Sequence, residues 1–270
     1  MLLAIDVGNT NITCALFRKK EMVASFRLMT KQSRTSDEYG MTLISLITSN
    51  SLNVEDVKAV IIASVVPKVN YSLNSAIIKY FHITPVEVGP GIRTGIRLAL
   101  DNPKQVGADR ILDAVAAYEI YGGPVIVIDY GTATTFDFVT GDGALIGGAT
   151  APGIQTSAAS LWNATAKLPE VEIRRPYEIL GKETIPSMQA GIYYSQIGAT
   201  EMIIRRIKEE CGADNVKTVA TGGLGSMIKE GTDMIDIYDP SLTMYGLQIV
   251  YSKQKRKSRS PKQAPAEKQE

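Results

Sequence analysis

The chain has 270 residues, of which 44% are hydrophobic and 21% are charged, a composition typical of an ordinary globular protein of one or two domains. Two cysteines and one histidine exclude a disulfide scaffold and a zinc site built from Cys and His clusters, and they leave His82 as the one imidazole for a Ser-His-Asp or Cys-His mechanism. The net charge of +1 is unevenly distributed along the chain. Residues 252–270 hold seven Lys or Arg and two Glu, so the remaining residues have a net charge of −4.

Residues 1–100 predict a first α/β half. Asp6 interrupts the first apolar run and no later apolar run is long enough to span a bilayer, so we expect a cytoplasmic protein with no membrane partner. Three apolar runs joined by tight turns predict an antiparallel meander of strands at Leu2–Asp6, Ile12–Phe17 and Met22–Leu28. Helical spacing predicts a helix over Asp37–Thr48 with Ser36 as its N-cap. A buried strand, a helix and a short strand are expected at Val57–Val66, from Pro67 to about Phe81, and at Val86–Val88.

A linker-like stretch at Gly89–Asn102 leads to a second α/β half, which ends at residue 251. The apolar spacing of Gly107–Tyr121 predicts a helix with one buried face. A second meander, two helices, a strand and a closing helix follow at Pro124–Asp129, Ala133–Val139, Ala144–Ala149, Ile154–Asn163, Pro186–Glu210, Val216–Ala220 and Asp239–Tyr251. Residues 252–270 are expected to form a disordered basic tail. Because the rest of the chain has no basic excess, nucleic acid is not expected as a partner.

An internal repeat is the most informative feature of the sequence. The run Ala4–Thr10 (AIDVGNT) matches Val127–Ala133 (VIDYGTA), which lies 123 residues later. Each copy joins an apolar strand, an Asp, a glycine turn with polar side chains and the start of a second strand. The repeat predicts two duplicated halves, residues 1–100 and 101–251, with a cleft between them.

The residue types of each copy are suited to binding phosphate. Glycine lets the backbone approach a ligand closely, and turn N–H groups and Thr hydroxyls can donate hydrogen bonds to phosphate oxygens. A carboxylate beside phosphates repels them unless a cation lies between, so Asp6 or Asp129 implies a metal ion. One copy alone is better explained as an ordinary hairpin, whereas two copies in register favour phosphate binding.

Two further runs leave alternatives open. Gly107–Arg110 stands at the start of a predicted helix, where Asp109 is either an N-cap or a general base. Arg110 is either a surface ion-pair partner or a clamp for a carboxylate or phosphate. Thr221–Gly225 follows a predicted strand and is either a contact to a nucleotide or a tight turn.

An ordered set of motifs resembles the type III pantothenate kinases. The motifs are DVGNT (6–10), SVVP (64–67), DNPKQVGADR (101–110), DYGTATTFD (129–137), GGATAPGI (147–154) and TGGLG (221–225). This family belongs to the actin-like ATPase superfamily, together with sugar kinases and acetate kinase. The resemblance implies two ribonuclease-H-like α/β domains with ATP in the cleft, and a homodimer whose substrate site lies at the subunit interface. It also implies phosphorylation of pantothenate to 4'-phosphopantothenate, the first committed step toward coenzyme A.

The resemblance assigns roles to particular residues. Asp109 matches the family's proton acceptor, and Asp129 matches its ligand for potassium or ammonium. From the charge argument above, rather than from the resemblance, we expect Asp6 to contact the magnesium ion that accompanies ATP. The residues implied in ATP binding are Asp6, Val7, Gly8, Asn9, Thr10, Asn11, Ile12, Thr13 and Thr132. Those implied in pantothenate binding are Gly107, Ala108, Asp109, Arg110 and Thr184.

One departure from the family and two alternatives bear on the substrate. Leu100 stands where the family often has a tyrosine that contacts pantothenate, and the lost hydroxyl weakens binding unless another group replaces its hydrogen bond. The chain could instead be a kinase for another small hydroxyl substrate. It could also be a regulatory relative, since some are described as transcriptional accessory factors and the basic tail suits that role. The combination of Asp6, Asp109 and Asp129 with Thr132 favours an enzyme, because a protein that only binds needs no base.

Overall fold

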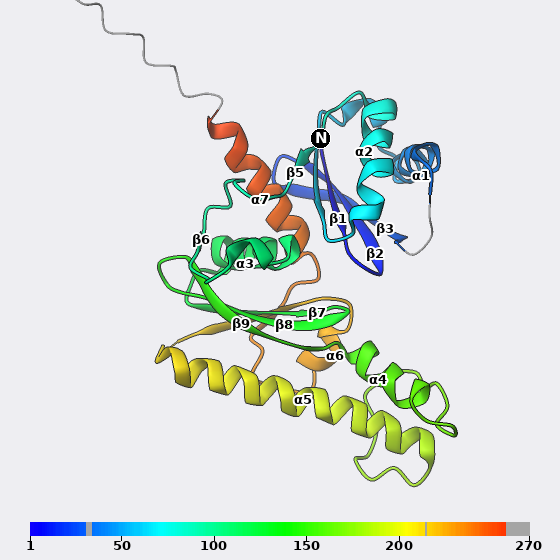
Figure 1. The fold of residues 1–270 in the computed structure, drawn as a ribbon, viewed down its shortest axis with the longest axis vertical. Helices are drawn as coiled ribbons and strands as arrows, with labels where there is room; N and C mark the ends of the chain where they lie inside the picture. The colour runs from blue at the N-terminus through cyan, green and yellow to red at the C-terminus, as the bar shows by residue number, and fades with distance from the viewer. Residues whose placement is uncertain (31–33, 214, 258–270) are drawn as a thin grey trace, which may run out of the picture.

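The computed structural model describes residues 1–30, 34–213 and 215–257, which form two mixed β-sheets with helices between and around them (Figure 1). The first sheet has the strand order β3-β2-β1-β4-β5. Its strands are β1 Leu2–Val7, β2 Asn11–Arg18, β3 Glu21–Met29, β4 Ala59–Ser64 and β5 Val86–Glu87. β2 runs antiparallel to β1 and β3, whereas β4 is parallel to β1 and β5 is parallel to β4.

The second sheet repeats the first. Its strands are β6 Arg97–Leu98, β7 Val125–Tyr130, β8 Ala133–Val139, β9 Ala144–Pro152, β10 Lys217–Thr221 and β11 Ile237–Tyr238, in the order β11-β10-β7-β8-β9-β6. From β9 to β11 the order and the strand directions are those of the first sheet from β3 to β5. The duplication predicted from the repeat is therefore confirmed, as is the α/β fold class.

The helices form layers around the two sheets. They are α1 Ser36–Ser49, α2 Pro67–Phe81, α3 Ala108–Tyr121, α4 Ile154–Asn163, α5 Thr184–Cys211, α6 Gly225–Lys229 and α7 Leu242–Lys257. Short 3-10 turns lie at Val54–Asp56 and Pro103–Gln105. α1 and α2 share a core with the first sheet, and α4, α5 and α6 share one with the second. α3 and α7 lie between the sheets, in a third core that includes strands of both (Figure 1). Among the described residues no helix has the length and apolarity needed to cross a membrane.

Alternation along β1 and β7 explains where their aspartates point. Successive side chains of a strand face opposite sides of its sheet. In β1, Leu2 and Ala4 pack in the central core and Leu3, Ile5 and Val7 pack against the outer helices, so Asp6 faces inward with the even-numbered residues.

β7 follows the same rule in the opposite sheet. Val125 and Val127 lie in the central core, whereas Ile126 and Ile128 lie in the outer one, so Asp129 also faces inward. The two carboxylates are therefore brought to facing surfaces of the two halves. Both strands are buried on both faces, which is why they read as continuous apolar runs until the aspartate.

The closing helix α7 ties the halves together. It follows the second sheet in sequence but packs on β1, β2 and β4 of the first. α3 and α7 cross so closely that a Cβ atom on Gly246 would lie 2.3 Å from the carbonyl oxygen of Leu112. Only glycine allows this approach of the two backbones.

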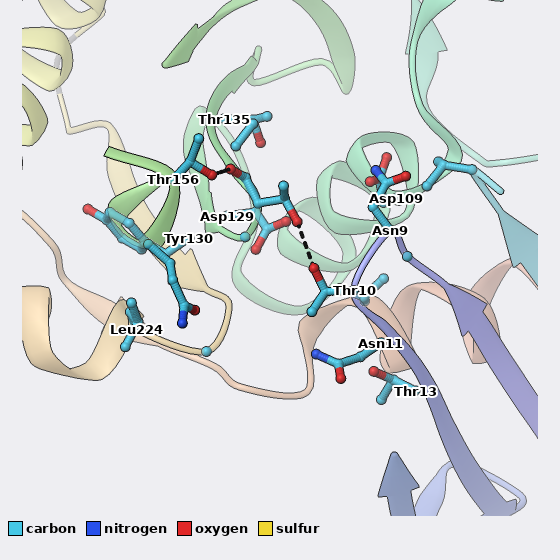
Figure 2. A pocket seen from close by; sticks show the side chains of 18 of the residues that line it. Asn9, Thr10, Asn11, Thr13, Asp109, Asp129, Tyr130, Thr135, Thr156 and Leu224 are labelled. Atoms are coloured by element: carbon cyan, nitrogen blue, oxygen red, sulfur yellow. Dashed lines mark hydrogen bonds between the residues drawn. The ribbon is translucent and has the colours of Figure 1, made fainter. Parts of the chain in front are cut away.

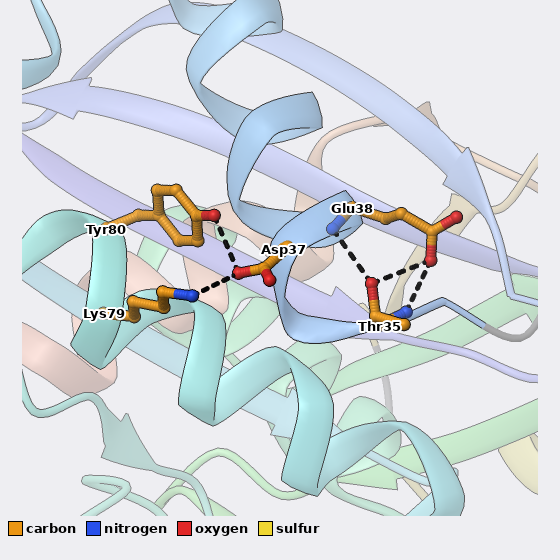
Figure 3. Close-up of polar contacts among 5 residues, drawn as sticks. All are labelled: Thr35, Asp37, Glu38, Lys79 and Tyr80. Atoms are coloured by element: carbon orange, nitrogen blue, oxygen red, sulfur yellow. Dashed lines mark hydrogen bonds and ion pairs between the residues drawn. The ribbon is translucent and has the colours of Figure 1, made fainter.

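The start of α1 differs from the prediction. Thr35, not Ser36, is the N-cap, and it forms a reciprocal capping box with Glu38 (Figure 3). Oγ1 of Thr35 accepts from the Glu38 N–H at 3.3 Å, and the Glu38 carboxylate accepts from the Thr35 N–H at 2.7 Å. Asp37 then joins α1 to α2, because its Oδ1 accepts from Nζ of Lys79 at 2.6 Å and from the hydroxyl of Tyr80 at 2.7 Å.

The predicted linker and the predicted C-terminal tail also differ from the structure. The stretch read as a linker contains β6, which pairs with β9 and extends the second sheet. α7 begins at Leu242 and continues to Lys257, so residues 252–257 of the expected disordered tail are helical. Residues 258–270 lie outside the described part of the chain, and the prediction of disorder is untested there. α6 and β11 have no counterpart among the predicted elements, because each is too short to carry a periodic pattern.

Candidate active site

A cleft of about 840 Å³ opens where the inward faces of the two halves meet. The residues that line it come from the β1–β2 and β7–β8 turns, α3, α4, the loop after β10 and the start of α7. They are Asp6, Gly8, Asn9, Thr10, Asn11, Thr13, Val65, Asp109, Arg110, Asp129, Tyr130, Gly131, Thr132, Ala133, Thr135, Gln155, Thr156, Ala159, Ser160, Asn163, Gly223, Leu224 and Thr243.

The two repeated turns meet across the cleft. The hydroxyl oxygens of Thr10 and Thr132 lie 3.2 Å apart, within hydrogen-bond distance (Figure 2). Gly8 donates its N–H to the carbonyl of Asn11, whereas Gly131 donates to Ala133, so the second turn is one residue shorter. The sequence repeat aligns Thr132 with Asn9, but the structure makes Thr10 its counterpart. The two turns thus meet through one hydroxyl from each half.

Equivalent contacts hold both turns from behind. Thr30 donates its N–H to the Thr10 carbonyl at 3.0 Å, and Gly153 donates its N–H to the Thr132 carbonyl at 3.2 Å. The Thr156 hydroxyl adds a second hydrogen bond to the Thr132 carbonyl at 2.7 Å (Figure 2). With their carbonyls held in this way, the turns present their hydroxyls in a fixed direction.

Asp6 and Asp129 are the two carboxylates that the repeat brings into the cleft. Burial raises the pKa of Asp6 to about 7, with the charges of Asp109 and Asp129 adding to the effect. Burial likewise raises the pKa of Asp129 to about 7, with contributions from Asp109 and Asp137. Each carboxylate therefore destabilises the ionised form of its neighbours, and a bound cation would relieve that repulsion.

Asp109 lies in the first turn of α3. Its Oδ1 accepts the N–H of Arg110 at 2.9 Å. The N-cap is Gly107, so the interpretation of Asp109 as the N-cap is wrong. A Cβ atom on Gly107 would lie 2.3 Å from Oδ1 of Asp109, so glycine leaves the space in which the carboxylate lies. Asp109 lines the same cleft as Asn9 and Asp129 (Figure 2).

A further carboxyl group lies below the cleft floor, one helical turn beyond Asp109. Asp113 is 2% exposed and accepts the Thr243 hydroxyl at 2.6 Å, which joins α3 to α7. Burial raises the pKa of Asp113 well above its ordinary value, and the charges of Asp129, Asp109 and Asp6 raise it further. The buried site therefore favours the neutral form of Asp113 over the ionised form.

The loop after β10 closes over Asp129. Gly222 has φ +89°, and a Cβ atom there would lie 2.6 Å from Oδ1 of Asp129 and from the backbone of Tyr130. Gly223 and Leu224 line the cleft, and Tyr238 donates its hydroxyl to the Gly222 carbonyl at 2.9 Å. The run TGGLG therefore lies against the cleft, which its interpretation as a contact to a nucleotide requires.

The structure sorts the predicted site residues into two groups. It brings Asp6, Gly8, Asn9, Thr10, Asn11, Thr13, Asp109, Arg110, Asp129 and Thr132 to the cleft. Val7 and Ile12 have no exposed surface and pack in the outer core of the first half, so only their backbone could reach a ligand. Gly107 and Ala108 adjoin the cleft without lining it, whereas Thr184 is exposed at the start of α5.

Sequence reasoning missed several of the residues that line the cleft. Thr135 is signalled by its inward position on β8, and Gln155 and Thr156 by the helix that follows the run GGATAPGI. Thr243 has no local signal, because only the fold returns α7 to the cleft. Leu100 packs against the central core between the sheets.

The donor groups of the cleft suit hard cations. Carboxylate, hydroxyl and amide oxygens are the ligands that Mg²⁺ and alkali cations prefer, and the cleft offers all three. In the described part of the chain no three Asp, Glu, His or Cys side chains converge closely enough to hold a metal ion unaided. Mg²⁺ usually takes one or two carboxylates and completes its shell with water and substrate phosphates, and Asp6 and Asp129 are carboxylates of this cleft.

The raised pKa of Asp129 predicts a measurable effect on stability. Between its ordinary pKa near 3.8 and its folded pKa of about 7, the folded chain holds more protons than the unfolded chain. The contribution of Asp129 to the free energy of unfolding therefore falls as pH rises through this window. We expect Asp129→Asn to be more stable than wild type at pH 8 and to lose this advantage near pH 4.

Thermal unfolding at the two pH values, in buffer free of magnesium and potassium, measures the effect. Each kcal/mol gained should raise the midpoint by about 2–4 °C. Asp142→Asn is the control, because Asp142 is exposed and its pKa is lowered by a hydrogen bond from Thr140. A midpoint for Asp129→Asn at or below that of wild type at pH 8 would contradict the prediction.

Comparisons with known proteins show the family of the chain. A family model described as type III pantothenate kinase matches residues 2–206. A type III pantothenate kinase from Agathobacter rectalis is 58% identical over 257 residues, covering 95% of this chain and 99% of the relative. Another from Listeria monocytogenes serotype 4a is 48% identical over 255 residues, covering 94% and 98%. A Campylobacter jejuni structure titled as a Baf family transcriptional activator has a TM-score of 0.60 and 17% identity over 94% of this chain and 99% of its own, which shows a shared fold alone. The resemblance seen in the sequence is confirmed, and the chain belongs to the type III pantothenate kinase family.

Proposed function

We propose that the chain transfers the γ-phosphate of ATP to the hydroxyl group of pantothenate, giving 4'-phosphopantothenate at the start of coenzyme A synthesis. The observation that carries the proposal is the meeting of two phosphate-binding turns, at Thr10 and Thr132, beside three carboxylates in one cleft. Family membership supplies the substrate, and the cleft supplies groups suited to phosphoryl transfer.

ATP lies across the two turns in this proposal. Thr10 and Thr132 donate their hydroxyls to phosphate oxygens, replacing the hydrogen bond that they make with each other. Asn9, Asn11 and Thr13 lie beside Thr10 and complete the polar wall of the first half (Figure 2). Phosphoryl transfer needs little covalent chemistry from the protein, so positioning and charge stabilisation account for most of the rate.

Asp109 accepts the proton of the attacking hydroxyl. The N–H of Arg110 and the space beside Gly107 fix the direction of its carboxylate, and a fixed acceptor holds the substrate oxygen in line with the phosphate. The proton can move late in a loose transition state, so Asp109 acts without being a strong base.

Two cations fit the cleft. Asp6 contacts the magnesium ion that accompanies ATP, and Asp129 holds potassium or ammonium. The support is their shared position on facing sheets, their mutual repulsion and the oxygen-rich lining. When bound, these cations supply charge neutralisation, which lets the carboxylates stay ionised beside phosphate groups.

Thr184 reaches a substrate only through a second copy of the chain. It is exposed at the start of α5, away from the cleft of its own chain. The side chains of Tyr177, Ile179, Leu180 and Ile185 nearby are exposed as well, at 102%, 57%, 79% and 46%. Apolar side chains exposed in such a cluster mark an interaction surface. We propose that a homodimer covers this cluster and presents Thr184 to the partner's substrate site.

The first experiment measures ADP release from Mg-ATP with and without pantothenate, each with and without potassium. We expect release that depends on pantothenate and is stimulated by potassium. Release with a different small alcohol but not with pantothenate would point to another kinase of this fold. No release from folded protein that still binds ATP would favour the regulatory alternative, which has no cleft feature in its support.

A further inference from the structure

The carboxylate of Asp137 holds Arg110 in the cleft. Its Nε donates to Oδ2 of Asp137 at 3.0 Å, and its Nη2 donates to Oδ1 at 2.6 Å. The Asp137 side chain is 4% exposed, whereas that of Arg110 is 26% exposed and lines the cleft. This two-pronged pairing uses two of the five N–H donors of the guanidinium and fixes its plane.

The strand beside Asp137 is shaped to admit the pair. Gly148 on β9 lies directly opposite Asp137 on β8. A Cβ atom on Gly148 would lie 2.1 Å from the Phe136 carbonyl oxygen, 2.9 Å from Oδ1 of Asp137 and 3.1 Å from Nη2 of Arg110. Any other residue would fill the space that the paired groups share. The glycine is thus a second, independent indication that the pair is a built feature.

The surroundings explain why Arg110 needs such a partner. Among the described residues that line the cleft, Arg110 is the one cationic side chain, and Asp6, Asp109 and Asp129 are all present. An arginine without a fixed partner could turn to any of these carboxylates. It would then neutralise the proton acceptor or compete with a cation. Asp137 draws the guanidinium to the β8 side and leaves the remaining donors for a ligand.

We propose that Asp137, with the space left by Gly148, is a positioning residue that fixes Arg110 to receive the carboxylate of the substrate. This inference rests on the proposed function, since pantothenate supplies the carboxylate. Asp137 itself touches no substrate in this account and acts through Arg110. Its removal should therefore weaken recognition of the acidic substrate while leaving the nucleotide site intact.

The test compares Asp137→Asn with wild type in steady-state kinetics. The amide keeps the size of the side chain but cannot accept both N–H donors of the guanidinium. We expect the KM for pantothenate to rise at least about tenfold, the scale of one charge-assisted hydrogen bond. The KM for ATP should change less than about twofold on the same reasoning. If the ion pair had only a structural role, Asp137→Asn would lower the melting temperature and leave the KM for pantothenate unchanged. That result would overturn the proposal.

A matched control lies in the turn between β8 and β9. Asp142 also pairs with an arginine, Arg97 at 2.8 Å, but both side chains are well exposed, at 68% and 66%. Asp142→Asn should leave both KM values unchanged. Asp137→Glu, which restores the charge, should recover part of the pantothenate affinity.

Double substitution decides whether Asp137 acts through Arg110. In an Arg110→Gln background, adding Asp137→Asn should cause no further rise in the KM for pantothenate, because the group that Asp137 positions is gone. A further rise would overturn the proposal. The double variant has no unpaired buried charge, whereas Arg110→Gln alone leaves the buried Asp137 unpaired, so the melting temperature of each variant is measured beside its KM. If Asp137→Asn or Arg110→Gln fails to fold, Asp137→Glu, which keeps the charge but displaces it, supplies the comparison: an unchanged KM for pantothenate in Asp137→Glu would overturn the proposal. If wild type itself shows no turnover with pantothenate, the proposed function fails. The inference fails when an active wild type is matched by Asp137→Asn, or when the double variant shows the further rise in KM.

Discussion

Replacing Asp109 with asparagine is expected to lower kcat by about 10²–10⁴-fold, the range contributed by a general base. The amide matches the carboxylate in size, so the space beside Gly107 and the N–H of Arg110 can still receive it. It cannot take a proton from the attacking hydroxyl. We do not expect Asp6 and Asp129 to substitute, because they extend from the ends of β1 and β7, whereas Asp109 extends from α3. ATP binding should therefore remain largely intact.

The same variant gives a second readout. The charge of Asp109 contributes to the raised pKa of both Asp6 and Asp129, so its removal should lower both. The pH dependence of Mg-ATP binding, followed by calorimetry, should shift toward acid. Asp101→Asn is the control, since Asp101 is exposed in the same DNPKQVGADR run. Turnover by Asp109→Asn within a few-fold of wild type would exclude Asp109 as the base.

The duplicated architecture could be predicted because each copy of the repeat is a short, continuous run of the sequence. An apolar strand, an aspartate and a glycine turn are contiguous in each copy, and the inward direction of Asp6 and Asp129 follows from strand alternation. The turns could not be aligned correctly from sequence. Because the second turn is one residue shorter, Thr132 corresponds to Thr10, whereas the sequence repeat aligns it with Asn9, and only the hydrogen-bond pattern reveals this.

The remaining features depend on contacts between distant segments. Thr243 and Asp113 meet because α7 returns to the first half and crosses α3, and neither residue carries a sequence signal for that contact. Asp137 stood at the end of a recognised motif, yet its role emerges only when β8 brings it to Arg110 and β9 offers Gly148. β6 was hidden within a glycine-rich connection, since a strand of two residues has no alternation to detect.

Replacing Asp6 with asparagine should reduce kcat/KM for ATP by about 10²-fold, a loss comparable to that of one preorganised electrostatic contact at a reacting phosphate. Asp6 and Asp129 occupy equivalent positions in the two halves but are proposed to hold different cations. Asp6→Asn should therefore raise the magnesium concentration needed for half-maximal rate, with the potassium requirement little changed. Asp129→Asn should show the opposite pattern.

Initial rates measured over a magnesium series at fixed potassium, and over a potassium series at fixed magnesium, separate the two roles. Because the pKa of Asp6 is about 7, Mg-ATP binding by wild type should strengthen as pH rises through neutrality. Asp6→Asn should flatten that dependence, since the carboxylate that loses its proton is gone. An unchanged magnesium requirement in Asp6→Asn would mean that the duplicated aspartates do not divide the cations between them. In that case the asymmetry of the site would have to arise from α3, which supplies Asp109 and Arg110 from one side of the cleft only.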